Sequence, residues 1–165
     1  MLFRFVIILF LFFISIDFCH CPTAYALTFV NYYTDSYNDT FSYTKEGIEV
    51  IPDGKMKVSV VEEYSYNGKL NLIKLRSKYG LSLAGYDNLS FTIFVFELNM
   101  DSYKYTLLGY GDFDSSGNII FSYVYKDKNW YFAEKDSPAR SLIDSIKSFY
   151  KSTWYRKTAE KNLPF

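Results

Sequence analysis

The sequence predicts an α+β fold, in which an antiparallel β-sheet of about six strands is packed by a C-terminal amphipathic helix. The first observation is the composition, because 17 Tyr and 16 Phe bring the aromatic share to 21% and aromatic residues favour strands. The second is the order of patterns, since short strand-like runs separated by turn residues precede a helical pattern near the C-terminus. Strands joined by hairpins and followed by a terminal helix form the two layers of such a domain.

The first part of the chain contains four strand-like segments. They span residues 28–34, 41–44, 47–51 and 56–64. Pro52-Asp53-Gly54-Lys55 separates the last two as a turn, because proline presets φ and glycine takes the left-handed conformation. The segment MKVSVVEEY alternates apolar and polar residues and predicts a strand.

The period of the pattern changes over residues 67–79. Leu72, Leu75 and Tyr79 fall at helical spacing, and Gly80 follows as a C-cap. The spacing predicts one short helix here, with a pair of strands as the alternative.

A second group of strands follows. Residues 87–100 are apolar on both faces in the middle, as expected of a central strand. The next predicted strands are 103–113, 118–125 and a short one over 129–132.

The last predicted element is an amphipathic helix. Ser137 is its N-cap, and Pro138 takes the first helical position, where a missing N–H has no cost. Apolar residues then recur at helical spacing and should cover the sheet; they are Leu142, Ile143, Ile146, Phe149, Tyr150 and Trp154. The polar residues 155–165 are predicted to fray.

The N-terminus has the pattern of a cleaved signal peptide. Arg4 precedes the uncharged run FVIILFLFFISI, and Ala24-Tyr25-Ala26 supplies small residues before Leu27. Twelve helical residues reach about 18 Å, which is short for a bilayer core of about 30 Å. We expect residues 1–26 to be removed, residues 27–154 to form one domain, and no transmembrane span to remain. An uncleaved anchor, a buried core segment and a lipidated cysteine are the alternatives.

Cleavage there would remove Cys19, His20 and Cys21 together, and the chain from Leu27 onward contains no Cys and no His. This composition excludes Ser-His-Asp and Cys-His nucleophilic sites, Cys/His zinc sites and disulfides in that part of the chain. We therefore expect no catalytic residues and no cofactor. The 18 basic and 18 acidic residues cancel, which argues against a nucleic-acid partner.

Two groups of acidic residues are candidates for a metal site or a catalytic site. Asp112-Phe113-Asp114-Ser115-Ser116-Gly117-Asn118-Ile119 resembles a calcium loop, but Tyr123 stands where the final bidentate carboxylate is required. We interpret it as a hairpin, because Asp, Ser and Gly also suit such a loop. Glu97 and Asp112 would form a glycosidase-type pair only if their strands brought them together.

The C-terminal helix carries the one candidate binding face. From Ser137 onward the chain contains six basic residues and only two acidic ones, Asp144 and Glu160. The basic residues are Arg140, Lys147, Lys151, Arg156, Lys157 and Lys161. They form either a face for an anionic partner or a solvated helix face.

The order of several features carries a resemblance. These features are the strand start DNLSFT at 87–92, Tyr110, the hairpin DSSGNII at 114–120, Trp130 and Ser137. Their order over Leu27 to Trp154 resembles the surface-adhesin protein E-like family of small secreted bacterial proteins. That family uses cysteines to tie its helix to its sheet, and this part of the chain has none. A tryptophan often opens that domain, and Phe29 would stand in its place here.

The resemblance implies an antiparallel sheet with a C-terminal helix, and binding rather than catalysis. Members of the family are envelope or surface proteins, some of which attach to host matrix proteins. The sequence thus favours an exported binding module of the periplasm, cell surface or extracellular space. A periplasmic structural or accessory protein and a small carboxylate-based hydrolase remain alternatives, and an exposed sheet edge would allow a homodimer.

Overall fold

The computed structural model describes residues 28–161, with side chains described through Tyr150. The strands are β1 (Phe29–Thr34), β2 (Thr40–Ile51), β3 (Lys55–Glu63), β4 (Leu89–Asn99), β5 (Lys104–Asp114), β6 (Ile119–Val124) and β7 (Tyr131–Phe132). The helices are α2 (Tyr66–Lys78), the short 3-10 helix η1 (Tyr86–Asn88) and α3 (Pro138–Lys161). The proposed signal peptide, with Cys19, His20 and Cys21, lies outside the described residues.

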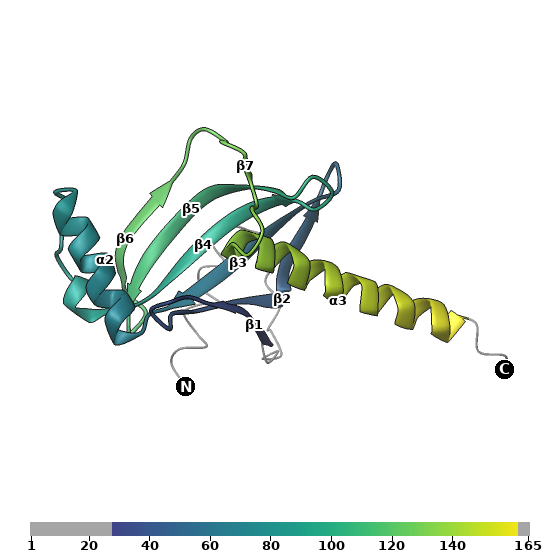
Figure 1. Ribbon diagram of the computed structural model, residues 1–165, viewed down its shortest axis with the longest axis horizontal. Coiled ribbons are helices and arrows are strands. Elements are labelled where there is room, and N and C mark those ends of the chain that lie inside the picture. The colour runs from purple at the N-terminus through teal and green to yellow at the C-terminus, as the bar shows by residue number, and fades with distance from the viewer. Residues whose placement is uncertain (1–27, 162–165) are drawn as a thin grey trace, which may run out of the picture.

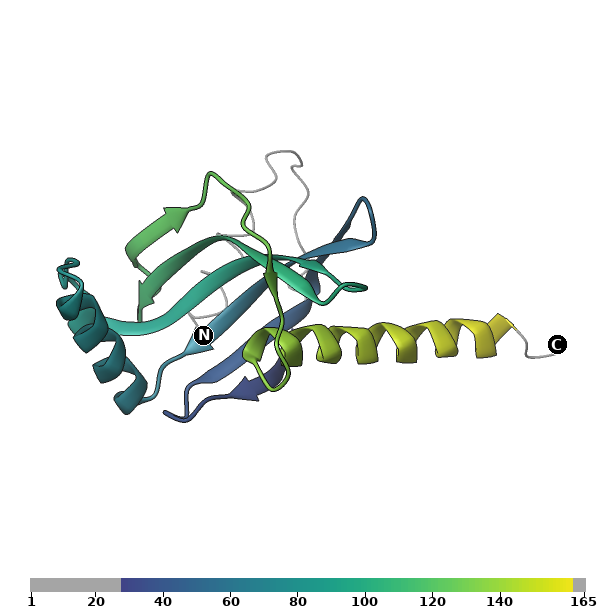
Figure 2. The same ribbon diagram turned by 45° about the horizontal axis from the view of Figure 1, so that its top comes forward.

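The strands form one antiparallel sheet whose spatial order follows the chain from β1 to β6, and the short β7 pairs with β5. The sheet is curved, with α2 at one end and α3 crossing it near β1, β2 and β3 before extending beyond its edge (Figures 1 and 2). The predicted α+β fold is therefore confirmed. No helix within residues 28–161 has both the length and the apolar character needed to cross a membrane.

One face of the sheet, which we call the inner face, lies toward both helices. Cross-strand pairing aligns Val60 of β3 with Phe94 of β4 and Phe94 with Tyr110 of β5. Because directly paired residues of neighbouring antiparallel strands point to the same face, these three side chains mark the inner face.

The main core forms where α3 meets the inner face. Leu142, Ile143 and Ile146 are fully buried against Tyr43 and Val60. Three residues of the predicted apolar stripe therefore contact the sheet as expected, and Phe149 and Tyr150 are half-buried. The side chain of Trp154 lies outside those described.

The start of α3 agrees with the prediction. The Ser137 hydroxyl accepts a hydrogen bond from the Arg140 N–H at 3.2 Å, and Pro138 is the first helical residue. The helix continues to Lys161, so it includes much of the segment 155–165 that the sequence predicts to fray.

Segments 41–44 and 47–51 belong to one strand rather than two. β2 pairs with β3 along both, and the register shifts between Tyr43 and Ile48. A bulge absorbs the extra residues, so the polar stretch around Lys45 and Gly47 bends the strand without ending it. The start of the predicted strand 87–100 is instead η1, preceded by Gly85 at a φ of 83°.

The helix predicted over 67–79 exists as α2. The Ser65 hydroxyl accepts a hydrogen bond from the Gly68 N–H at 3.0 Å, and Gly80 ends the helix with a φ of 65°. Of the three side chains whose spacing predicts the helix, Leu72 is half-buried, whereas Leu75 and Tyr79 are exposed.

Polar contacts hold the start of α2 in place. The buried Asp39 carboxylate accepts a hydrogen bond from the Ser65 N–H at 2.6 Å. A Cβ on Gly68 would lie 1.8 Å from Asp39 Oδ2, so only glycine fits there. The turn between β1 and β2 thereby fixes where α2 leaves the sheet.

The predicted hairpin between β5 and β6 is confirmed. The Asp114 carboxylate accepts hydrogen bonds from the N–H groups of Ser116 and Asn118 at 2.9 and 2.8 Å. A further hydrogen bond, from the side chain of Asn118, contributes most to lowering the pKa of Asp114 below its usual value, and the backbone bonds add to this effect. Asp112, two residues earlier, takes part in a separate buried cluster.

Candidate functional site

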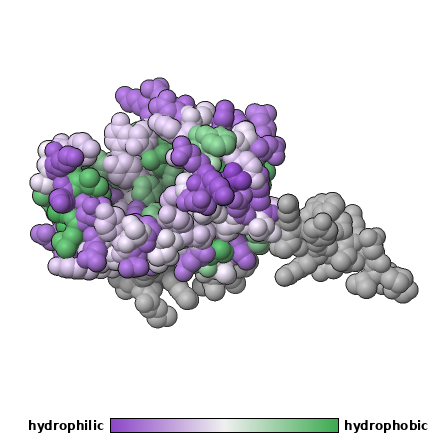
Figure 3. Space-filling view, in the orientation of Figure 1, coloured by the Kyte–Doolittle hydropathy of each residue, from purple (hydrophilic) through white to green (hydrophobic). Residues whose placement is uncertain are grey.

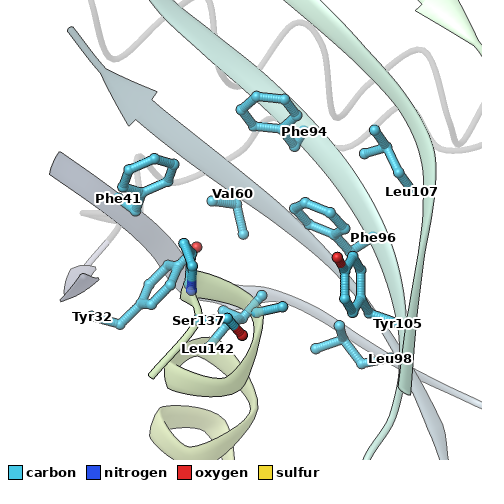
Figure 4. A pocket seen from close by; sticks show the side chains of 12 residues that line it. Tyr32, Phe41, Val60, Phe94, Phe96, Leu98, Tyr105, Leu107, Ser137 and Leu142 are labelled. Atoms are coloured by element: carbon cyan, nitrogen blue, oxygen red, sulfur yellow. The ribbon is translucent and has the colours of Figure 1, made fainter. Parts of the chain in front are cut away.

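The inner face is not fully covered between α2 and α3. A cavity of about 260 Å³ lies at the start of α3. Figure 4 shows Phe41, Phe94, Phe96 and Leu107 on the sheet side of this cavity, with the first turns of α3 below them. Ala139 and Leu142 line it from the helix.

A second cavity of about 290 Å³ lies between α2 and the sheet. Leu72, Leu75 and Tyr79 line it from the helix, and Phe94 and Tyr110 line it from the sheet. Phe94 lines both cavities, so they adjoin on the inner face, and we call the two together the inner groove. Figure 3 shows a hollow in this region with hydrophobic residues inside it.

Aromatic side chains from neighbouring strands line the inner groove. The ring centroid of Phe94 lies 5.9 Å from that of Phe96 and 6.1 Å from that of Tyr110, and the Phe96 and Tyr105 centroids are 6.0 Å apart. These separations are in the range of favourable aromatic pairs. Because alternate residues of a strand point to the same face, β4 contributes both Phe94 and Phe96 to the lining.

A buried ion pair closes the α2 end of the inner groove. Asp112 accepts hydrogen bonds from the Thr92 hydroxyl at 2.6 Å and from the Tyr86 hydroxyl, and Arg76 Nη1 lies 3.8 Å from its Oδ2. The Arg76 guanidinium stacks on the Tyr86 ring at 4.0 Å and donates from Nε to the Ser82 carbonyl at 3.1 Å. The Asp112 and Arg76 side chains are both buried, so each charge depends on the other.

The polar cluster extends from Asp112 across two strands. The Tyr64 hydroxyl lies 3.0 Å from Thr92 Oγ1 and donates to Glu62 Oε2, also at 3.0 Å. Pairing places Glu62, Thr92 and Asp112 in one row across β3, β4 and β5. The row joins two carboxyl groups through hydroxyl groups on the inner face.

The environment sets the protonation of this cluster. Burial raises the pKa of Glu62 to about 7, and the negative charges of Asp39, Asp35 and Asp112 add to this effect. The hydrogen bond from Tyr64 acts in the opposite direction and lowers the pKa. Burial also raises the pKa of the Tyr64 and Tyr86 phenols, which therefore stay protonated and can donate.

The carboxyl groups of this cluster are either fully hydrogen-bonded or placed away from the cavities. Both oxygens of Asp112 already hold partners, and Glu62 does not line either cavity. Glu97 pairs with Thr106 and Asp112 with Thr92, on opposite faces of the sheet, so they do not form the carboxylate pair considered from the sequence. Among the described side chains, no group of three or more His, Cys, Asp or Glu is placed to hold a metal ion.

Arg140 and Lys147 of the C-terminal helix line neither cavity of the inner groove. Arg140 Nε donates to Asp144 Oδ2 at 3.0 Å, and its guanidinium stacks on the Tyr103 ring at 3.6 Å. Lys147 Nζ lies 3.5 Å from the centroid of the same ring. The side chains of Lys151, Arg156, Lys157 and Lys161 lie outside those described. An anionic partner for this face therefore stays a prediction.

Sequence reasoning did not find the buried cluster. Its clearest signal is Thr92, a polar residue in the middle of the apolar run of β4. Glu62, Arg76 and Asp112 are far apart in the chain, and only the strand register and the position of α2 bring them together.

No protein-family model matches the chain, and neither the curated proteins nor the solved structures contain a significant match. The inner groove is therefore assigned on its geometry.

Proposed function

We propose that the protein is an exported binding module of the cell envelope or cell surface that holds its ligand in the inner groove. One observation carries the proposal: two cavities that share Phe94 remain open between α2 and α3 and are lined by aromatic side chains. A sheet of this size could bury that surface under its own helices. Here α2 is held at the end of the sheet by Asp39, and the surface stays accessible.

The dimensions of the inner groove support a ligand of moderate size. Ligand pockets typically have volumes of about 300–1,000 Å³, and the two adjoining cavities measure about 260 and about 290 Å³. The lining offers apolar and aromatic area, with the Tyr110 hydroxyl and the buried cluster at one end. These features suit an extended segment of a macromolecule that presents apolar side chains and a few hydrogen-bonding groups.

The nature of the partner is inferred from the sequence. The N-terminal pattern favours export, and the resemblance to the surface-adhesin protein E-like family favours an envelope macromolecule or a host matrix protein. Membership of that family is itself part of this proposal. The alternative is a periplasmic structural or accessory protein without a host ligand, and protease shaving of intact cells would distinguish the two, because only a surface protein is removed.

A carboxylate-based hydrolase is the other alternative. The raised pKa of Glu62 is what favours it, because a general acid needs such a pKa near neutrality. The partners of Asp112 disfavour it, since both of its carboxylate oxygens already accept hydrogen bonds from buried hydroxyl groups.

A homodimer through the sheet edge also belongs to the proposal. β6 is an edge strand with no charged residue and no proline, and its Ile119 and Val124 are exposed. In proteins that remain monomeric, edge strands usually carry charged residues or proline, which prevent pairing with another chain.

The test fills the inner groove with a larger side chain rather than shortening the side chains that line it. Ala139→Trp places an indole in the cavity at the start of α3, and Val50→Trp adds the same group at an exposed site in β2. Binding to a panel of immobilised matrix proteins and glycans, and of 1-anilinonaphthalene-8-sulfonate in solution, should be lost with Ala139→Trp and kept with Val50→Trp. Unchanged binding of the panel by an Ala139→Trp variant that melts like the parent would refute the groove as the binding site.

A further inference from the structure

Helix α2 and the loop after it expose an unusual amount of apolar surface. The exposed side chains are Tyr66, Leu70, Leu75, Tyr79, Leu81 and Leu83, with Tyr66 at 77%, Tyr79 at 69% and Leu81 at 50%. Single exposed leucines are ordinary, but a cluster of this kind usually marks an interaction site. Figure 3 shows hydrophobic residues gathered at the end of the molecule where Figure 1 places α2.

The same segment is basic. From Tyr66 to Gly85 the chain contains Lys69, Lys74, Arg76 and Lys78 and no acidic residue, whereas the whole chain has a net charge of zero. Arg76 is buried and paired with Asp112, so the lysines supply the accessible charge. Within the described part of the chain, no carboxylate lies within ion-pair distance of these three lysines.

Helical geometry sets the arrangement of these groups. At 100° per residue, Lys74 and Lys78 lie on the outer side of α2, between Leu70 on one flank and Leu75 on the other. The helix therefore presents a lysine stripe with an apolar margin on each side, and the following loop adds Leu81 and Leu83 at its end. We call this set of apolar residues and lysines the α2 patch.

We propose that the α2 patch docks the protein on an anionic lipid surface. Interfacial helices combine lysines, which meet lipid headgroups, with leucine and aromatic side chains that enter the boundary of the acyl chains. Tyrosine suits this depth because one end of its ring is apolar and the other polar. The tightly held start of α2 supports the assignment, since contacts at Asp39 and Gly68 anchor the helix while Leu70 and Leu75 remain exposed.

Charge argues against a second copy of the chain as the occupant. Two α2 patches facing each other would oppose like charges, which disfavours association. An anionic bilayer supplies the complementary charge over the whole patch. Docking there would also bring the α2 end of the inner groove to the lipid, because Leu75, Tyr79 and Leu81 line that cavity as well.

The test measures partitioning of the purified protein onto phosphatidylcholine vesicles with and without phosphatidylglycerol. Binding should require the anionic lipid and should weaken when NaCl is raised from about 0.1 M to about 1 M, because the screening length falls from about 10 Å to about 3 Å. Lys74→Gln with Lys78→Gln should lower partitioning about thirtyfold, since each lysine near such a surface contributes roughly fivefold. Lys104→Gln with Lys126→Gln, two exposed lysines elsewhere, is the matched control.

A local readout separates the α2 patch from any other segment that binds lipid. Brominated acyl chains should quench the emission of an indole introduced by Tyr79→Trp and leave the indole of Val50→Trp unchanged. Leu70→Ser with Leu81→Ser should weaken binding, whereas Val50→Ser with Phe132→Ser should not, and all four positions are exposed.

Three outcomes would overturn the proposal: no binding to anionic vesicles at low salt, equal binding by the lysine variant and its control, or equal quenching at residues 79 and 50. Binding of the α2 patch to an acidic protein in the absence of vesicle binding would also overturn it. Lys74 and Lys78 line neither cavity of the inner groove, so failure of the lysine test is distinguishable from failure of the proposed groove.

Discussion

Glu62 should make the folded protein less stable as the pH rises through neutrality. Its pKa is raised to about 7 in the folded state, against 4.5 for an ordinary glutamate. Between these two values the folded protein binds the proton and the unfolded chain has released it. The free energy of unfolding therefore falls with increasing pH over this window. Replacing the carboxyl group by an amide with Glu62→Gln should remove the effect.

The magnitude follows from the two pKa values. One pKa unit corresponds to about 1.36 kcal/mol, so the difference between 4.5 and about 7 corresponds to at most about 3.4 kcal/mol above neutral pH. Glu62 is only partly buried, and water at its exposed part reduces the penalty. We expect the free energy of unfolding of Glu62→Gln, measured relative to that of the parent, to rise by about 1–3 kcal/mol between pH ~4.5 and pH ~8.

Urea unfolding followed by circular dichroism across this pH range gives both curves. Glu63→Gln is the matched control, because Glu63 is the next residue of β3 and is exposed on the opposite face. The Glu62→Gln variant keeps an acceptor for the Tyr64 hydroxyl, so the hydrogen bond to Tyr64 does not explain a difference. Parallel stability curves for the parent and Glu62→Gln, separated by a constant offset, would refute the reasoning.

Four further changes test the rest of the structure by urea unfolding or by molar mass. Ile146→Ala should lower the free energy of unfolding by about 2–5 kcal/mol, because its side chain is fully buried under α3, and no change would mean that the stripe does not pack on the sheet. Arg76→Ala should cost about 3–5 kcal/mol by leaving the Asp112 carboxylate buried without its partner, and adding Asp112→Asn should recover part of this loss; equal losses would show that the pair is not coupled. Gly68→Ala should cost about 1–3 kcal/mol because the new Cβ overlaps the Asp39 carboxylate, and an unchanged melting temperature would contradict that contact. Val124→Lys should shift any dimer seen by light scattering to monomer, because a lysine on β6 blocks edge pairing; a dimer that persists would place the interface elsewhere.

Local chemistry was enough to predict most of the elements. The Pro-Asp-Gly-Lys turn, the Ser137 cap and the glycine after α2 each act within a few residues, and each is found where the sequence places it. The single strand β2 shows the limit of such reasoning. Its polar middle resembles a break between two strands, but pairing with β3 on both sides keeps it continuous through a bulge. Only the neighbouring strand decides between these outcomes.

The buried cluster at the end of the inner groove could not be predicted, because strand register alone brings its members together. Glu62, Thr92 and Asp112 form a row only when β3, β4 and β5 pair as they do. A shift of one residue in any pair would move one member to the opposite face. The sequence showed Asp112 as part of a calcium-like loop, and the structure turns it toward Arg76 instead.

Helix α2 shows why an apolar pattern alone does not identify a core. Helical spacing of leucines predicts α2 correctly, because spacing reports the backbone period. It does not report what the leucines contact, and here buried polar groups attach the helix while Leu70 and Leu75 stay exposed. The distinguishing signal lies in the other residues: Gly68 allows the close approach of Asp39, and the lysines occur without acidic partners. A helix that packed its leucines on the sheet would need neither feature, so both point to a surface whose apolar residues meet something outside the chain.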